Sequence, residues 1–394
     1  MAAPEDVGLS SERLARLDAY MQRQVQDQHV AGIQVLVARH GKIAFFNSVG
    51  MADRDAARPI DDGTIFAINS MTKTITSVAV MMLYEQGHFL LTDPIEKYLP
   101  ELADRQVHVS GEGDDLVTRP ASRSITIQDL LRSTAGMTYE GIGQGPVPRL
   151  YTENNVNWMA GSAAQFVTNL AKTPLITDPG TRWEYAGGTN VLARLVEVVS
   201  GQAFDAYVRD HVLTPLGMDD TGYYVSPDKI DRLSATYEKQ ANGALSQTDG
   251  NRERYGVEHP YKMGDSGMVS TTLDFYRFAQ MLLNGGDLDG VRLLGPRTVS
   301  FMTKDHLAAD TERQWVLQPG HGYGLGFDVL VDPVPTATLA SPGTYFWMGG
   351  QGAVFWVDPA QDLIAILMVQ IAPPLLPAMR AELEALVYQA VIDD

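Results

Sequence analysis

Hydrophobic and polar positions at the two ends of the chain follow the periods of helices and strands. Residues 10–27 (SSERLARLDAYMQRQVQD) place Ser10 as a suitable N-cap ahead of apolar residues at helical spacing. Residues 32–50 and 352–370 are each two β-rich runs joined by a turn, which predicts two hairpins. Residues 378–391 return to helical spacing. The two ends therefore predict one antiparallel sheet with helices beside it.

The middle of the chain has a different pattern. Residues 125–134, 162–172, 189–201 and 273–286 carry apolar residues three and four positions apart, and several of these runs end in glycine. Each of them predicts an amphipathic helix. Residues 136–159 are rich in glycine, proline and aromatic residues, which predicts a long loop. A connection of that length is usually functional, as a lid or a pocket wall.

These patterns together predict an α/β (α+β) fold. At 394 residues the chain is long for one small core, so we expect two domains or one large domain with an inserted layer. The antiparallel sheet from both chain ends, flanked by helices, would take residues 1–90 and 250–394. A mainly helical domain would take residues 91–249, with the active site between the two.

Composition and charge narrow the classes of function. The formal net charge of −18 argues against nucleic acid or an anionic membrane surface as a partner, because both attract clustered Lys and Arg. The absence of cysteine excludes disulfides, a thiolate nucleophile and thiolate metal sites. The histidines form no metal-ligand pattern. No apolar run approaches a membrane span, and the N-terminus lacks a signal-peptide pattern. We therefore expect a cytoplasmic protein without metal or cofactor.

One polar pair stands at the start of the most apolar helical run. Residues 66–87 (FAINSMTKTITSVAVMMLYEQG) contain Ser70 and Lys73, which share one face of a helix at this spacing. The apolar residues that follow predict a helix buried on most sides. Lys73 lies in its first turn, where both the helix dipole and burial disfavour a cation. Polar residues that break local rules in this way tend to be functional.

The chemistry of this pair suits nucleophilic catalysis. The Lys73 amine can lie within hydrogen-bond reach of the Ser70 hydroxyl, and a desolvated lysine gives up its proton more easily. The Ser70 backbone N–H can stabilise an oxyanion. An ordinary N-cap serine, with Lys73 extended to solvent, accounts equally well for the pair alone. A second pair with this spacing, Ser226 and Lys229, is typical of a helix start.

Two further segments agree in order and spacing with the serine β-lactamases and penicillin-binding proteins, which contain a Ser-x-x-Lys motif. Tyr185, in GTRWEYAGG, stands before a predicted helix, where class C enzymes carry Tyr-x-Asn. Trp347, in YFWMGGQG, leads a predicted strand where Lys-Thr-Gly or His-x-Gly is expected. Residues 8–370 resemble the family VIII carboxylesterases, which share the class C β-lactamase fold.

The resemblance implies a serine carboxylesterase with an acyl-enzyme mechanism and no cofactor. Ser70 would attack an ester carbonyl, Lys73 and Tyr185 would share the role of general base, and water would later release the acid. The N–H groups of Ser70 and Gly350 would form the oxyanion hole. The substrate pocket would be lined by Trp347, Met348, Gly349, Gly187, Tyr139 and Trp158.

Two departures from the family motifs bear on the substrate. Gly187 stands in place of the motif asparagine, so the amide that would steer a substrate amide is missing. Trp347 replaces the Lys or His that would bind the carboxylate of a β-lactam, and an aromatic ring suits an apolar acyl or alcohol group. Both changes favour simple short-chain esters. The alternatives are that Trp347 only forms a pocket wall and that Tyr185 is a packed core aromatic.

Other functions stay open on the same scaffold. They are a β-lactamase, a D-amino-acid peptidase or amidase, and an acyltransferase with the same acyl-enzyme. The non-enzyme alternative is an inactive ligand-binding homologue, against which the joint presence of Ser70, Lys73 and Tyr185 argues. An α/β-hydrolase is disfavoured because Gly-x-Ser-x-Gly occurs nowhere. The expected partner is a small-molecule ester, and the oligomeric state stays open.

Overall fold

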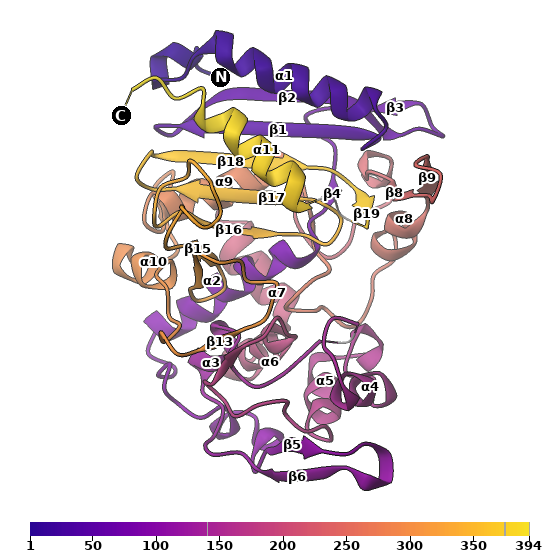
Figure 1. Cartoon of the computed structure of the whole chain (residues 1–394), viewed down its shortest axis with the longest axis vertical. Coiled ribbons are helices and arrows are strands. Elements are labelled where there is room, and N and C mark those ends of the chain that lie inside the picture. Colours follow the sequence, from indigo (N-terminus) through magenta and orange to yellow (C-terminus); the bar gives the residue numbers. More distant parts are fainter. Residues whose placement is uncertain (140, 374–375, 394) are drawn as a thin grey trace.

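The computed structural model describes residues 1–139, 141–373 and 376–393. Its largest element is an eight-stranded antiparallel sheet in the order β14-β15-β16-β17-β18-β1-β2-β3 (Figure 1). The strands are β14 (His321–Tyr323), β15 (Asp328–Leu330), β16 (Tyr345–Met348), β17 (Val354–Asp358), β18 (Leu363–Met368), β1 (Gly32–Arg39), β2 (Lys42–Asp53) and β3 (Arg58–Pro59).

The two ends of the chain meet in the middle of this sheet, as the sequence predicts. β1 pairs with β18 in a register that runs from Gln34 opposite Met368 to Arg39 opposite Leu363. Both strands are buried along their whole length, because helices cover both faces of the sheet. The predicted antiparallel sheet with flanking helices is therefore confirmed, as is the α/β fold class.

Side-chain alternation divides the apolar residues of β1 and β18 between two cores. Val35 and Val37 pack in a core with α1 (Ser11–Gln26) and α11 (Leu376–Tyr388). Their neighbour Leu36 packs on the other face, in the larger core that contains α2 (Thr72–Glu85) and α9 (Thr272–Leu283). This double burial explains why these strands are continuous apolar runs.

Further helices and short strands lie outside the eight-stranded sheet. The helices are α3 (Ile127–Leu131), α4 (Pro146–Glu153), α5 (Ala163–Leu170), α6 (Gly188–Ser200), α7 (Phe204–Val208), α8 (Gly250–Tyr255) and α10 (Pro296–Met302). The paired strands are β4 (Phe66–Ala67) with β10 (Val269–Ser270), β5 (Gln106–Ser110) with β6 (Val117–Pro120), β7 (Arg182–Trp183) with β13 (Glu312–Arg313), β11 (Asp287–Leu288) with β12 (Val291–Arg292), and β8 (Thr236–Lys239) with β9 (Leu245–Thr248) and β19 (Ile371–Ala372).

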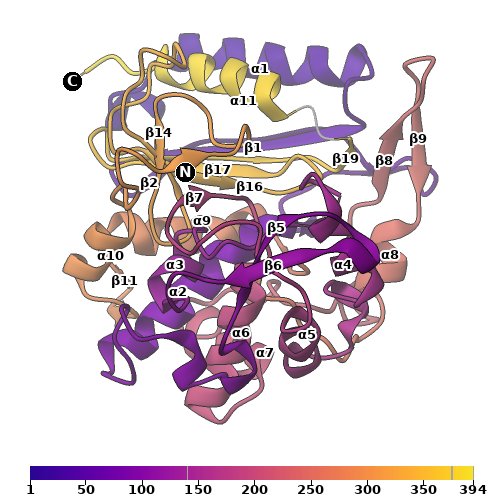
Figure 2. The same cartoon turned by 60° about the horizontal axis from the view of Figure 1, so that its bottom comes forward.

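Helices α3 to α6 form a separate layer below the sheet, and α2 lies between this layer and the sheet (Figure 1). The β5–β6 hairpin crosses the outer side of this layer, and the β8–β9 hairpin projects beside the sheet with α8 at its base (Figure 2). The division into residues 1–90 with 250–394 and residues 91–249 stays a prediction. Among the described residues, no helix is long and apolar enough to cross a membrane.

Most predicted elements form, and one prediction is wrong. Ser10 caps α1, since its side chain accepts a hydrogen bond from the N–H of Arg13 at 3.2 Å. The segment 136–159 is not a plain loop, because it contains α4. That helix has a proline at its start and buries Val147 and Tyr151 one turn apart. Residue Glu140 of the segment lies outside the described residues.

Candidate active site

Ser70 lies in a tight turn directly before α2. The turn is a short 3-10 helix, Asn69–Met71, and Asn69 has a positive φ of 44°. The end of β16 abuts this turn, because a Cβ on Gly349 would lie only 2.5 Å from the carbonyl oxygen of Ile68. A side chain at position 349 would force the strand and the turn apart. The glycine therefore permits the close approach of two segments that are far apart in sequence.

Ser70, Lys73 and Tyr185 are brought together by hydrogen bonds. The Ser70 Oγ lies 2.7 Å from the Tyr185 Oη, and the Lys73 Nζ donates to the same Oη at 3.0 Å. Among the described residues, no hydrogen bond joins Lys73 directly to Ser70, so the phenol oxygen stands between the two. The Tyr185 backbone N–H donates to Gln314 Oε1 at 3.1 Å, which fixes the chain just before α6.

Lys73 is almost completely buried, at 3% exposed, on a helix that is buried from Thr72 to Leu83. Besides Tyr185, its Nζ donates to the backbone carbonyl of Asp265 at 2.9 Å. The Nζ also lies 4.8 Å from the ring centroid of Tyr185 and 5.8 Å from that of Tyr139. Carbonyl oxygens and aromatic faces both stabilise a cation. The environment therefore compensates the cost of burying an ammonium group.

Asp265 is a charged residue of this site that the sequence patterns do not reveal. It is fully buried, and its Oδ2 lies 4.0 Å from the Lys73 Nζ. The same oxygen accepts a hydrogen bond from the Tyr139 hydroxyl at 3.1 Å. Within the described part of the chain, Asp265 Oδ1 has no hydrogen-bond partner. Asp265 is thus the carboxylate that pairs with the Lys73 ammonium in this arrangement, 192 positions after Lys73 in the sequence but beside the first turn of α2.

Tyr139 completes a stack of aromatic rings. Its ring lies on that of Tyr185, with centroids 5.6 Å apart. Burial, together with the negative charge of Asp265, raises the pKa of Tyr139 well above its usual value. Tyr139 therefore remains a neutral hydrogen-bond donor to the Asp265 carboxylate.

Gly187 leaves a space that other side chains approach. A Cβ built on Gly187 would lie 3.4 Å from the Asn190 Nδ2 and 3.6 Å from the Asp265 Oδ2. The Asn190 Oδ1 in turn accepts the Asp265 backbone N–H at 3.2 Å. A side-chain amide is thus present next to Gly187, one helical turn later than the family motif places it.

Trp347 packs against Tyr185 and away from solvent. It is 4% exposed, and its ring centroid lies 5.9 Å from that of Tyr185 and 5.4 Å from that of Tyr323. Met348 follows at the end of β16. The next residues, Gly349 and Gly350, form a turn, and among the described residues the Gly350 N–H makes no hydrogen bond. This N–H is therefore available to an oxyanion.

Two adjoining cavities lie on the Tyr139 side of the site, and among the described residues neither is lined by Ser70, Lys73 or Tyr185. A cavity of about 150 Å³ is lined by Tyr139, Gly187 and Trp158, among others. A larger cavity, of about 500 Å³, shares Trp158 and Met263 with it. Trp158 is 64% exposed, so its ring forms an outer wall of both cavities.

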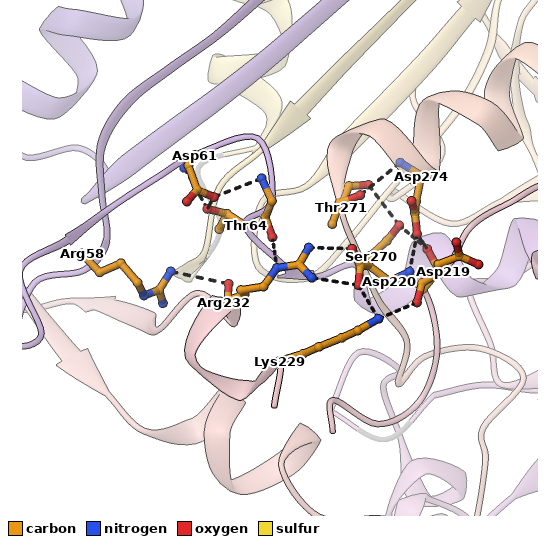
Figure 3. A network of polar contacts seen from close by, with 12 residues as sticks. Arg58, Asp61, Thr64, Asp219, Asp220, Lys229, Arg232, Ser270, Thr271 and Asp274 are labelled. Atoms are coloured by element: carbon orange, nitrogen blue, oxygen red, sulfur yellow. Dashed lines mark hydrogen bonds and ion pairs between the residues drawn. The ribbon is translucent and has the colours of Figure 1, made fainter. Parts of the chain in front are cut away.

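The second pair with Ser-x-x-Lys spacing has a different environment. Lys229 donates to Asp220 Oδ1 at 2.8 Å and to the Asp219 carbonyl at 3.1 Å, and Arg232 pairs with the same Asp220 carboxylate (Figure 3). Ser226 lies in a turn before a short 3-10 helix and not at the start of an α-helix. The charge of Lys229 is thus held in a surface ion-pair network.

Comparisons with known proteins agree with this geometry. A model of the beta-lactamase family matches residues 17–389. The chain is 34% identical to a protein of Mycobacterium tuberculosis, over 88% of this chain and 87% of that protein. It is 30% identical to the esterase EstB of Burkholderia gladioli, over 91% of this chain and 90% of EstB. The solved structure of EstCE1, described as a hydrolase with promiscuous acyltransferase activity, matches with a TM-score of 0.82 at 25% identity, over 96% of this chain and 99% of EstCE1.

Proposed function

The chain belongs to the beta-lactamase family, and we propose that it is a serine carboxylesterase of the family VIII type, acting on short-chain esters. The observation that carries the proposal is the contact of the Tyr185 Oη with both the Ser70 Oγ and the Lys73 Nζ. A phenol oxygen that accepts from the Lys73 ammonium and lies within hydrogen-bond distance of the serine hydroxyl is placed to take the serine proton. Similarity to EstB supports ester hydrolysis within the family.

In the proposed reaction, the Ser70 Oγ attacks the ester carbonyl and passes its proton to the Tyr185 Oη. The N–H groups of Ser70 and Gly350 stabilise the oxyanion of the tetrahedral intermediate. The C–O bond to the alcohol then breaks, and the alcohol leaves with the proton from Tyr185. Water attacks the acyl-enzyme, Tyr185 accepts its proton, and Ser70 is released with that proton as the acid departs.

We assign different roles to the two candidate bases. Tyr185 exchanges the proton with Ser70, since their oxygens are 2.7 Å apart. Lys73 acts through its charge, because its hydrogen bonds run to the Tyr185 Oη and the Asp265 carbonyl. An ammonium group 3.0 Å from the Tyr185 Oη stabilises negative charge on this oxygen during proton transfer. The sequence motifs imply that Lys73 and Tyr185 share the role of general base. In this proposal Tyr185 alone is the base, and Lys73 stabilises its charge.

The proposed substrates are neutral esters whose alcohol and acyl groups are small. Trp347 gives the site an aromatic neighbour where a lactamase would have a cation, which favours esters over β-lactams. Acyl transfer to an alcohol is a second candidate, favoured by the likeness to EstCE1, a hydrolase with promiscuous acyltransferase activity. Transfer and hydrolysis differ only in whether an alcohol or water attacks the acyl-enzyme.

A substrate panel tests the proposal. p-Nitrophenyl butyrate, p-nitrophenyl palmitate, nitrocefin and D-alanyl p-nitroanilide would be compared by kcat/KM. We expect the butyrate to be the best substrate. If acyl transfer also occurs, the reaction in the presence of methanol should yield both the free acid and its methyl ester. A preference for nitrocefin or for the amide would contradict the argument from Trp347.

A further inference from the structure

The larger cavity next to the site is lined by more cations than carboxylates, although the chain as a whole is acidic. Its volume is about 500 Å³, and it meets the smaller cavity at Trp158 and Met263. Three tyrosines line it, namely Tyr223, Tyr255 and Tyr261. Two cations, Arg254 and Lys262, line it as well, against one carboxylate from the exposed Glu253. In a chain of net charge −18, a cavity with excess positive charge is a local exception.

Lys262 is the more informative of the two cations. Its side chain is only 11% exposed, and its only ion pair within the described part of the chain is with Glu258, at 3.6 Å. Glu258 is 70% exposed, so that interaction is weakened by solvent. A long side chain can be mostly buried while its charged end stays accessible. Lys262 borders the open cavity, and its weak ion pair with Glu258 leaves its ammonium group able to take a further anionic partner.

Arg254 connects this wall of the cavity to the segment that contains Asp265 and Ser266. It extends from α8, and its Nη2 donates to the Ser266 Oγ at 3.4 Å. Ser266 directly follows Asp265, whose carbonyl holds Lys73. Arg254 has no carboxylate partner among the described residues, unlike Arg252 on the same helix, which pairs with Asp231 at 2.6 Å. Its guanidinium is therefore free to pair with a ligand.

We propose that this cavity binds a carboxylate at the far end of a longer substrate, so that among longer esters those with an anionic tail are preferred. One ammonium and one guanidinium group suit a single negative charge, and the three tyrosines suit the apolar segment that leads to it. The proposal rests on the esterase function above: a short neutral ester would not extend to this cavity, and a longer one would pass Trp158 and Met263 to reach Arg254 and Lys262.

Paired substrates test this inference. Mono-p-nitrophenyl esters of adipic, suberic and sebacic acid would be compared with matched esters whose far carboxylate is capped as a methyl ester. A second series would place the carboxylate on the alcohol side, as ω-carboxyalkyl butyrates and their methyl esters. In at least one series we expect the ratio of kcat/KM, anionic over capped, to exceed one for the longer members and to fall as salt is added.

The variants R254Q and K262M remove the two charges and keep most of each side chain. The double variant should lower the anionic-to-capped ratio about tenfold or more, whereas R252Q, on the same helix but paired with Asp231, should leave the ratio as in the wild type. A ratio near one in both series, or a ratio that the double variant does not change, would overturn the inference. Failure of the wild type to hydrolyse even the capped and short esters would instead overturn the proposed esterase function.

Discussion

Replacing Asp265 by asparagine tests the electrostatic design of the site most sharply. The substitution keeps the shape of the side chain and an oxygen to accept the Tyr139 hydroxyl, but it removes a buried negative charge. The Oδ2 lies 4.0 Å from the Lys73 Nζ. At an effective dielectric constant of about 20, a charge pair at that distance is worth about 4 kcal/mol. The asparagine variant therefore lacks the ion pair that stabilises the buried Lys73 ammonium.

The expected consequence is a loss of rate. If the full 4 kcal/mol reached the transition state, kcat/KM would fall about a thousandfold, and we expect a fall between about tenfold and that limit. The loss should appear mainly in kcat, because the charge acts on the reacting Tyr185 oxygen rather than on the binding of a neutral ester. Steady-state hydrolysis of p-nitrophenyl butyrate measures kcat and KM separately.

A matched variant separates charge from hydrogen bonding. Tyr139→Phe removes the hydrogen bond to Asp265 Oδ2 but keeps the negative charge, and it should lower kcat/KM at most about tenfold. Circular dichroism and the melting temperature would show that both variants are folded. An Asp265→Asn enzyme with a kcat/KM within twofold of wild type would refute the reasoning.

Three further predictions follow from other parts of the structure. Tyr185→Phe should lower kcat by about 10²- to 10⁴-fold with little change in melting temperature, because it removes the oxygen that accepts the serine proton; steady-state kinetics would check this. Gly349→Ala should lower kcat about tenfold or more, since its Cβ would lie 2.5 Å from the Ile68 carbonyl, whereas Gly222→Ala, with open space around the new Cβ, should behave as wild type. Asp129 is buried, but hydrogen bonds from Arg123 and the Thr126 N-cap overcome that burial and lower its pKa to about 2. Because the folded-state pKa lies below the unfolded value, the stabilisation is present above about pH 4 and lost as pH falls toward about 2. Asp129→Asn should therefore lower the free energy of unfolding by about 2 kcal/mol at neutral pH, and urea titrations at neutral and acidic pH should show the difference narrowing.

The parts of the molecule that sequence predicts are those with local signals. The sheet strands and α1 follow from periodicity and capping, and Ser70, Lys73 and Tyr185 from short motifs in a fixed order. Lys73 stood out because it breaks a local rule, and its partners explain how the fold accommodates it.

The parts that sequence did not predict depend on contacts between distant segments. Asp265 has no pattern of its own, and its role arises only because its loop lies against the first turn of α2. Asn190 approaches the space at Gly187 from the next turn of α6, which the spacing of the family motif does not suggest. The helix α4 was hidden because glycine and proline dominate the segment around it.

Covalent labelling of Ser70 is the most direct test of the central claim, that this serine is the nucleophile. The wild-type protein and Ser70→Ala would be incubated with a p-nitrophenyl phosphonate and analysed by intact mass and peptide mapping. We expect one adduct per chain on the peptide that contains Ser70, no adduct on Ser70→Ala, and no hydrolysis of p-nitrophenyl butyrate by that variant. An adduct on Ser226 or Ser266, or full esterase activity in Ser70→Ala, would contradict the claim.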